Sequence, residues 1–242
     1  MKFKDWLGCS LWRTLCFNFR LLPFRQALRL PVIVFRGSRF AGLKGRCVIE
    51  GEVRHAMIKL GQPCVTGWET RATTICLNGT MIFRGKCTIG SGSTVETRAG
   101  GVLTLGRNFR ITAGCSIFCD LAVTFGDDVL ISWETLFMDS DKHFLYDGER
   151  LLNAPAPIVI GNHVWICCRS TILKGTCLPD GCAAAAGSIL SRSFAECGNC
   201  LIGGSGAGQK VLRRGITWSP RMIPESRSPE AGEEGTVSGP AD

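Results

Sequence analysis

The stretch VIGNHVWICCRSTILKGTCLPDGCAAAAGSILSRSF, residues 159–194, decides the fold of this 242-residue chain. Aliphatic residues recur in it at every sixth position, at Ile160, Ile166, Ile172, Leu178, Ala184 and Leu190. Small or β-branched residues form a second series two places earlier, at Ile158, Val164, Ser170, Thr176, Cys182 and Ser188. A period of six fits neither a helix, with 3.6 residues per turn, nor a single amphipathic strand, with a period of two. It is typical of a solenoid in which three hexapeptides complete one coil.

The same repeat extends toward the N-terminus in a weaker form. Strands are expected from about Cys47, and the six-residue phase is regular from Leu105. A slip of two residues before Phe125 starts a new register. Residues 138–157 are polar and have lost the period, which predicts a loop that leaves the solenoid and returns at Ile158. Such loops on rigid repeats are common places for function.

The positive charge of the chain, +8 in total, is concentrated in its first fifth. Residues 1–50 hold ten Lys and Arg against two Asp and Glu, whereas residues 51–220 hold sixteen against thirteen. The solenoid is therefore close to neutral, and we expect no nucleic-acid partner.

The fourteen cysteines do not have the placement of a disulfide framework. Cys167 and Cys168 are adjacent, and Cys182 stands at a repeat position, so they resemble small hydrophobic residues in a reducing compartment. The pair Cys197 and Cys200 lacks a second pair at zinc-finger spacing, and we expect no metal. Charged residues interrupt the first apolar stretch, which predicts no signal peptide and a cytoplasmic location.

Residues 1–46 form a basic, amphipathic N-terminal segment. Apolar residues recur there at i, i+4 spacing, with Trp6 beside them, at Phe3, Leu7, Leu11 and Leu15. Such a segment can lie on an anionic membrane, here through residues 1–40 at the inner face of the cell membrane. It can also cap the open end of a solenoid, the interpretation we favour. At the other end, residues 219–242 are rich in Pro, Gly, Ser and Glu, which predicts a disordered tail.

One group of residues has the composition of a catalytic site: Asp139, Asp141 and His143, all in the loop. If this segment is extended, alternation places the three side chains on one side. A carboxylate beside an imidazole fixes its tautomer, and the ordinary pKa of His, near 6.5, leaves it largely neutral at cytoplasmic pH. A solvated surface histidine is the alternative interpretation.

Several motifs carry a resemblance to a known family. They are Asp139-Ser140-Asp141-Lys142-His143, the run from Pro157 to Ile166, Thr171 to Gly175, Ala186-Gly187-Ser188, and Leu201 to Gly204. Across residues 47–218 the chain resembles the hexapeptide-repeat O-acyltransferases, in the branch that acetylates sugars, galactosides and surface polysaccharides. The resemblance implies a mainly β fold, a single-stranded left-handed parallel β-helix with a catalytic loop at residues 138–157.

The resemblance also implies roles for individual residues. His143 would be the catalytic base, and Asp141 or Asp139 would orient its ring. Acetyl-CoA, the acyl-donor co-substrate, would contact Cys168, Ala186, Ser191, Arg192, Lys210 and Arg213. The acceptor would contact Asp120 and Trp165. No metal is implied, and the active sites would lie in clefts between the subunits of a homotrimer. The family's Gly after Trp-Ile is Cys167 here, and the segment from Gly204 to Lys210 is longer than usual and lacks its Pro.

We therefore expect an acetyl-CoA-dependent O-acetyltransferase acting on a sugar hydroxyl of a surface polysaccharide or its precursor. N-acetylation of an amino-sugar nucleotide is the main alternative, although residues 1–50 contain no Gly-x-Gly-x-x-Gly motif. A non-catalytic solenoid that serves in assembly would not need Asp139, Asp141 and His143 in one loop. A γ-class carbonic anhydrase would need three converging histidines, and His55, His143 and His163 lack the close spacing.

Overall fold

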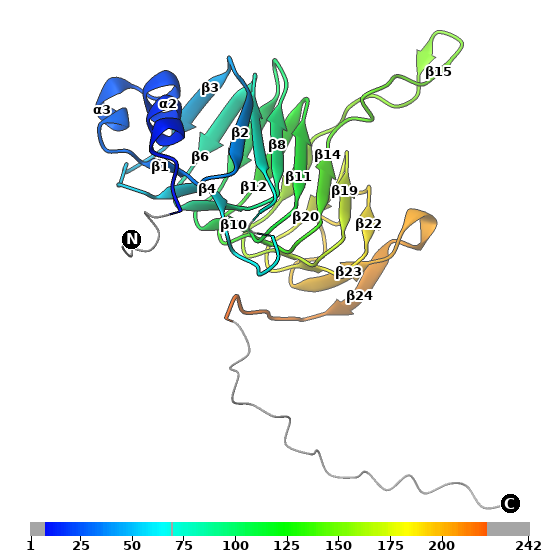
Figure 1. The fold of residues 1–242 in the computed structure, drawn as a ribbon. Coiled ribbons are helices and arrows are strands. Elements are labelled where there is room, and N and C mark those ends of the chain that lie inside the picture. Colours follow the sequence, from blue (N-terminus) through cyan, green and yellow to red (C-terminus); the bar gives the residue numbers. More distant parts are fainter. Residues whose placement is uncertain (1–7, 69, 222–242) are drawn as a thin grey trace, which may run out of the picture.

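The computed structural model describes residues 8–68 and 70–221, which form a prism of short parallel strands (Figure 1). The chain visits three sheets in turn, so that β4 pairs with β1, β5 with β2 and β6 with β3. Each circuit of three strands is one coil, and the next coil stacks on it through parallel hydrogen bonds. The expected parallel β-helix is confirmed.

The first face of the prism is a nine-stranded sheet in the described part of the chain. The strands are parallel except the last, which folds back antiparallel on β23 and closes the C-terminal end. In spatial order they are β1 (Val32–Val34), β4 (Ile58–Gln62), β7 (Cys87–Gly90), β10 (Phe109–Ile111), β13 (Leu130–Ile131), β18 (Trp165–Ile166), β21 (Ala183–Ala184), β23 (Cys200–Gly203) and β24 (Lys210–Arg214).

Parallel sheets of seven and six described strands form the second and third faces. The second face contains β2 (Ser38–Leu43), β5 (Thr73–Leu77), β8 (Thr94–Thr97), β11 (Ser116–Cys119), β14 (Leu136–Met138), β19 (Thr171–Leu173) and β22 (Ile189–Leu190). The third face contains β3 (Arg46–Ile49), β6 (Thr80–Phe83), β9 (Val102–Leu105), β12 (Ala122–Phe125), β17 (Ile158–Ile160) and β20 (Cys177–Leu178).

The period of six is visible in the strand register. Trp165 pairs with Ala183, and Ala183 pairs with Leu201, so the last coils repeat every 18 residues, or three hexapeptides. Both six-residue series are buried, because each places one small or aliphatic side chain on the inside of every strand or corner. Larger residues also lie inside: Phe109, Phe125 and Phe137 pack in tilted and edge-on contacts, with ring centroids 4.8 and 5.0 Å apart.

The N-terminal segment differs in two respects from the sequence expectation. The coil begins at β1, before residue 47, because Val32–Val34 already pair with β4. Helix α2 (Leu11–Leu21) and the short α3 (Phe24–Ala27) precede it. The buried face of α2 carries Thr14, Phe17 and Asn18, whereas Leu11 is exposed, so the expected Leu11–Leu15 stripe is not the packed face. Phe3, Trp6 and Leu7 lie outside the described residues.

Residues 139–157 leave the coil between β14 and β17, as the loss of periodicity predicts. Part of this loop is an antiparallel hairpin, β15 (Tyr146–Asp147) and β16 (Arg150–Leu151), which projects far from the body in Figure 1. The remaining element is a 3-10 turn, η1 (Gly206–Gly208), before β24. No helix in the described ranges has the length and apolar character needed to cross a membrane. Residues 222–242, most of the tail that the sequence predicts to be disordered, lie outside the described residues.

Candidate active site

A pocket of about 540 Å³ lies where the loop leaves the coil. Its floor is built from residues that follow three neighbouring strands of the second face: Arg98 after β8, Asp120 after β11 and Ser140 after β14. Because these strands stack in register, the three turns lie one above another at one corner of the prism. The loop supplies the remaining wall, including His143 and Asn153.

Asp139 fixes the start of the loop and does not face the pocket. Its side chain is fully buried, and its two carboxylate oxygens accept hydrogen bonds of 2.8 Å from the backbone N–H groups of Asp120 and Leu121. The segment is not extended, and Lys142 has a left-handed φ of 65°. The expectation that Asp139, Asp141 and His143 share one side is therefore wrong, because a bend after Met138 turns the chain.

Asp120 is the charged centre of the pocket. The Ser140 hydroxyl donates to it, the Lys142 ammonium lies 2.6 Å from Oδ1, and the Arg98 guanidinium lies 3.9 Å from Oδ2. Burial opposes ionisation, but Lys142, Ser140 and Arg98 together hold the pKa of Asp120 below its ordinary value. The carboxylate expected to contact the acceptor is thus ionised and already surrounded by donors.

Asp141 is bound to the coil that follows the loop. Lys174 Nζ lies 2.6 Å from its Oδ2, and Asn153 Nδ2 donates to the same oxygen at 2.9 Å. The hydrogen bond from Lys174 lowers the pKa of Asp141, and the one from Asn153 adds to that effect against a small opposing effect of burial. Lys174 also donates to the backbone oxygen of Asn153 at 2.9 Å, which fixes the returning arm of the loop.

The His143 ring is exposed and lines the pocket. Its backbone is well held, because Asn153 Nδ2 donates to its carbonyl at 2.8 Å and its own N–H donates to Asp141 O at 2.7 Å. Within residues 8–68 and 70–221 the imidazole has no hydrogen-bond partner. The carboxylate of Asp139 binds backbone N–H groups instead, and that of Asp141 binds Lys174. The expected orientation of the ring by one of these carboxylates is therefore absent from the single chain.

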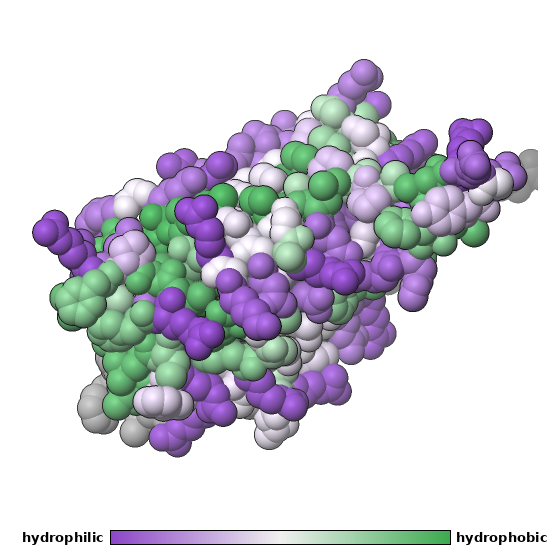
Figure 2. Space-filling model, turned by 90° about the horizontal axis from the view of Figure 1, so that it is seen from above, coloured by the Kyte–Doolittle hydropathy of each residue, from purple (hydrophilic) through white to green (hydrophobic). Residues whose placement is uncertain are grey.

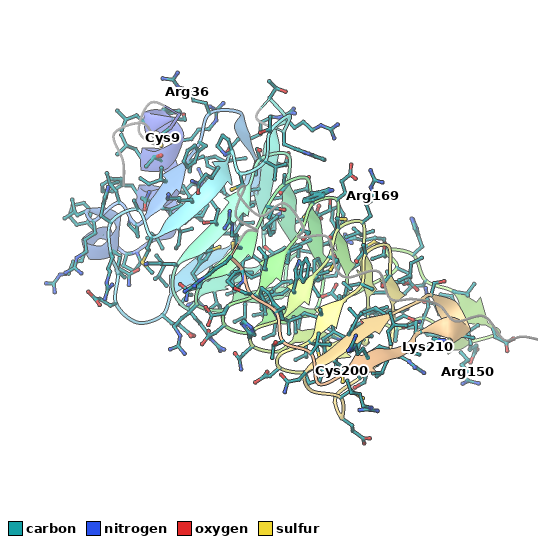
Figure 3. The ribbon with its side chains drawn as sticks, turned by 90° about the horizontal axis from the view of Figure 1, so that it is seen from below. Cys9, Arg36, Arg150, Arg169, Cys200 and Lys210 are labelled. Carbon is teal, nitrogen blue, oxygen red and sulfur yellow. The ribbon has the colours of Figure 1, made fainter. Side chains whose placement is uncertain are left out.

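The residues expected to contact the acyl donor form a second group at the C-terminal end of the coil. The buried Gln209 joins two of them: its Oε1 accepts from Ser191 N at 2.8 Å, its Nε2 donates to Ser191 Oγ at 2.9 Å, and its backbone oxygen accepts from Arg192. Lys210 follows directly and is exposed. Figure 3 shows Lys210 at this end of the molecule, far from Arg36 at the other.

The remaining expected donor contacts lie on neighbouring coils of the same region. The backbone oxygen of Cys168 accepts from Gly187 N at 3.0 Å, which sets Ala186 beside it on an exposed corner. Gly187 has φ +70°, and no atom lies within 4 Å of the position that a Cβ would occupy there, so the corner is open to a ligand. Arg213 pairs with Leu201 in the closing hairpin. These residues do not line the His143 pocket.

Trp165 also lies outside the pocket. It belongs to the first face, where its Nε1 donates to Ser132 Oγ at 3.0 Å and its ring is 6.0 Å from that of Trp218. Phe137, grouped with it in sequence, points into the core, whereas Trp133 is exposed. Within a single chain, Trp165 therefore lies outside the pocket in which the acceptor is expected to bind.

Sequence reasoning assigned no role to several residues that build the site. Lys174, Asn153, Lys142 and Arg98 position or neutralise the carboxylates, and each is separated from its partner by at least 12 residues in the chain. Lys174 stood within the Thr171–Gly175 motif, which was the available signal. In the described residues, no group of three or more His, Cys, Asp or Glu side chains could hold a metal ion.

Two curated proteins are similar to this chain in sequence. Galactoside O-acetyltransferase of Escherichia coli (strain K12) is 33% identical over 114 residues, 44% of this chain and 55% of that protein. A putative lipopolysaccharide biosynthesis O-acetyl transferase, WbbJ, of the same strain is 25% identical over 148 residues, 57% of this chain and 73% of that protein. The chain thus spans about half the length of the first of these relatives. No protein-family profile matches the chain.

Among solved structures, the polySia specific acetyltransferase NeuO superposes with a TM-score of 0.51 at 21% identity, covering 81% of each chain. That likeness is one of fold, and the fold is the left-handed parallel β-helix expected from the sequence. The chain therefore has O-acetyltransferases among its homologues and shares a fold with the acetyltransferase NeuO.

Proposed function

We propose that this protein is an acetyl-CoA-dependent O-acetyltransferase whose catalytic base is His143. The observation that carries the proposal is the exposed imidazole of His143 on the wall of the 540 Å³ pocket. A hydrogen bond from Asn153 to the backbone carbonyl of His143 holds this residue at a corner of the β-helix. The similarity to two curated O-acetyltransferases supports the reaction class. An exposed ring at a pocket is available to an incoming hydroxyl.

The chemistry follows from these parts. His143 removes the proton from an acceptor hydroxyl as the oxygen attacks the thioester carbonyl of acetyl-CoA. The new C–O bond forms, the C–S bond breaks, and the sulfur leaves with its electron pair and receives the proton from the imidazolium. General-base catalysis of this kind contributes on the order of 10²–10⁴-fold. Backbone N–H groups at a corner of the coil would stabilise the developing oxyanion.

The acceptor is best described as a sugar. The pocket presents a carboxylate, a hydroxyl and two cations, on Asp120, Ser140, Lys142 and Arg98. Such a mixture of donors and acceptors suits a ring with several hydroxyl groups. One curated relative is named for galactosides and the other for lipopolysaccharide biosynthesis. We therefore propose a surface polysaccharide or its precursor as the acceptor in this pocket, and the cytoplasm as the location of the reaction.

Acetyl-CoA would bind at the second group of residues, near Ala186, Ser191, Arg192 and Lys210. Exposed guanidinium and ammonium groups suit the phosphates of CoA. Because these residues do not line the His143 pocket, a complete site requires a second subunit to bring them to it. A homotrimer whose active sites lie in clefts between neighbouring subunits meets this need. The projecting hairpin, with Leu145, Tyr146 and Leu152 exposed, supports an intersubunit role for the loop.

The test is direct transfer by the purified full chain. Acetyl-CoA is supplied with separate neutral sugars, acidic oligosaccharides, amino-sugar nucleotides and free serine, and release of the CoA thiol is followed with the mass of the product. Formation of an alkali-labile O-acetyl ester on a saccharide is the expected result. Transfer confined to an amino group, or no transfer to any saccharide tested at high concentration, would contradict the proposal.

A further inference from the structure

Helix α2 has two faces with different roles. The inward face is bound to the first strand of the coil: Asn18 Nδ2 donates to Val32 O at 2.7 Å, and Thr14 Oγ1 accepts from Val34 N at 3.0 Å. Phe17, fully buried, joins the core. These contacts cap the open end of the solenoid, where unpaired strand edges would otherwise remain. They do not use the opposite face of the helix.

The opposite face is apolar and exposed. The side chains concerned, here called the N-terminal patch, are Leu11 (60% exposed), Trp12 (75%), Phe19 (45%), Phe24 (68%) and Leu28 (60%). The rings of Phe19 and Phe24 lie 6.0 Å apart, so the patch continues from α2 into α3. Figure 2 shows hydrophobic residues gathered at the end of the molecule where Figure 1 places these helices, with hydrophilic residues around them.

Basic residues surround the patch without any acidic neighbour in the sequence. Between Asp5 and Glu50 the chain has eight Lys and Arg and no Asp or Glu. Arg20, Arg25 and Arg29 are exposed on or beside the same two helices. Beside α2, a pocket of about 510 Å³ is lined by Trp12, Arg13 and Arg39 together with Ser10, Cys16 and Phe40. The pocket combines an indole and two guanidinium groups.

We propose that the N-terminal patch binds the surface of a bilayer that contains anionic lipids. Large apolar and aromatic side chains partition into the boundary between headgroups and acyl chains, and clustered arginines bind the phosphates above it. Contiguous exposed hydrophobic residues on this scale mark an interaction site. A second copy of the chain is a poor occupant, because the segment that carries the patch has a large excess of basic residues and two such surfaces would repel each other. The proposal goes beyond the acetyltransferase reaction and rests on different residues.

The experiment uses the intact chain and sedimentation with vesicles. Vesicles of phosphatidylcholine alone are compared with vesicles containing about one-third phosphatidylserine. The wild-type protein is expected to sediment with the anionic vesicles, not with the neutral ones, and to be released by salt because surface charges are screened. The double variant Trp12→Ser/Phe24→Ser is expected to lose at least about tenfold in partitioning, since two exposed rings no longer enter the interface.

A second variant separates charge from apolar contact. Arg25→Gln/Arg39→Gln should weaken binding several-fold and reduce its dependence on salt. Two matched controls lie outside the patch: Arg84→Gln removes an exposed arginine and Val102→Thr an exposed apolar residue, and both should bind as the wild type does. All variants change exposed side chains, and circular dichroism and thermal unfolding check that they fold.

Three results would overturn the inference. They are absence of vesicle binding by the wild type, equal binding to neutral and anionic vesicles, and unchanged binding by the folded Trp12→Ser/Phe24→Ser variant. Capture of an acidic protein through the patch, without vesicle binding, would also count against it. Without vesicles, the patch variants should transfer acetyl groups to a soluble acceptor at the wild-type rate. A failure of vesicle binding would therefore not contradict the proposed acetyltransferase reaction.

Discussion

The carboxylate of Asp139 accepts a 2.8 Å hydrogen bond from the backbone N–H of Asp120, and the adjacent N–H of Leu121 occupies its other oxygen. Asp139 begins the loop, and Asp120 lies at the same corner one coil earlier. The first acid of the Asp-x-Asp-x-His motif therefore joins two coils. Its position sets where Ser140 and the residues after it enter the pocket.

Replacing Asp139 with Asn should destabilise the protein without removing a group from the pocket. The amide keeps one acceptor oxygen and turns its NH₂ group toward a backbone N–H, so one buried donor loses its partner. Such a loss costs about 1–3 kcal/mol. We expect the free energy of unfolding in urea to fall by that amount. The matched control is Asp147→Asn at the exposed hairpin, which should stay within about 0.5 kcal/mol of the wild type. Equal stability of both variants would show that Asp139 does not anchor the loop.

The stability supplied by Asp120 should depend on pH in a defined direction. Its pKa in the folded protein lies below the ordinary value of 3.8, so the folded state binds fewer protons than the unfolded state as the pH falls. The contribution is complete above the unfolded pKa and is lost as the pH falls through the folded pKa. The difference in unfolding free energy between wild type and Asp120→Asn should be constant from neutral pH to about pH 5 and shrink below about pH 4. A difference that grows in acid would contradict this ion-pair arrangement.

His143→Ala should abolish acetyl transfer while leaving the fold and CoA binding intact. The lost general base accounts for about 10²–10⁴-fold in rate, and the exposed ring makes no hydrogen bond in the described residues that its removal would break. Initial rates, CoA binding by calorimetry and thermal unfolding are measured together. His163→Asn is the control, since Asn tolerates the left-handed φ of 52° at that position and His163 lies outside the pocket. A His143→Ala enzyme with more than about a tenth of wild-type activity would exclude His143 as the base.

Subunits with different lesions should restore activity when they assemble together. The proposed homotrimer combines His143 of one subunit with Arg192 and Lys210 of the next, so His143→Ala and Arg192→Ala subunits are each inactive alone. Mixed trimers contain some sites in which both residues are intact. Partial recovery is expected after joint refolding, and light scattering should give the trimer mass. A monomeric mass, or mixed trimers that remain inactive, would refute a shared site.

The sequence by itself determined the period of the coil and the location of the loop between β14 and β17. The coil requires a small or aliphatic residue at every sixth position, and this requirement is visible in the sequence itself. Ile160, Ile166 and Ile172 therefore reveal the repeat without any information on which residues are in contact in space. The same logic located the loop at residues 138–157, because the constraint is absent there. The buried side of α2 was not determined in this way, because both sides of the helix carry apolar residues.

The tertiary structure alone decided what each acid of the motif does. Asp139 and Asp141 are two residues apart, and the sequence pattern does not distinguish them. In the structure, Asp139 is buried against backbone N–H groups, whereas Asp141 is bound by Lys174. These partners lie 19 residues from Asp139, at Asp120, and 33 residues from Asp141, at Lys174, and become neighbours when the coils stack. Hydrogen bonds are short and directional, so they depend on the bend after Met138 and on the registers of β14 with β11 and with β19. The pattern of residues along the sequence contains neither the bend nor the strand register.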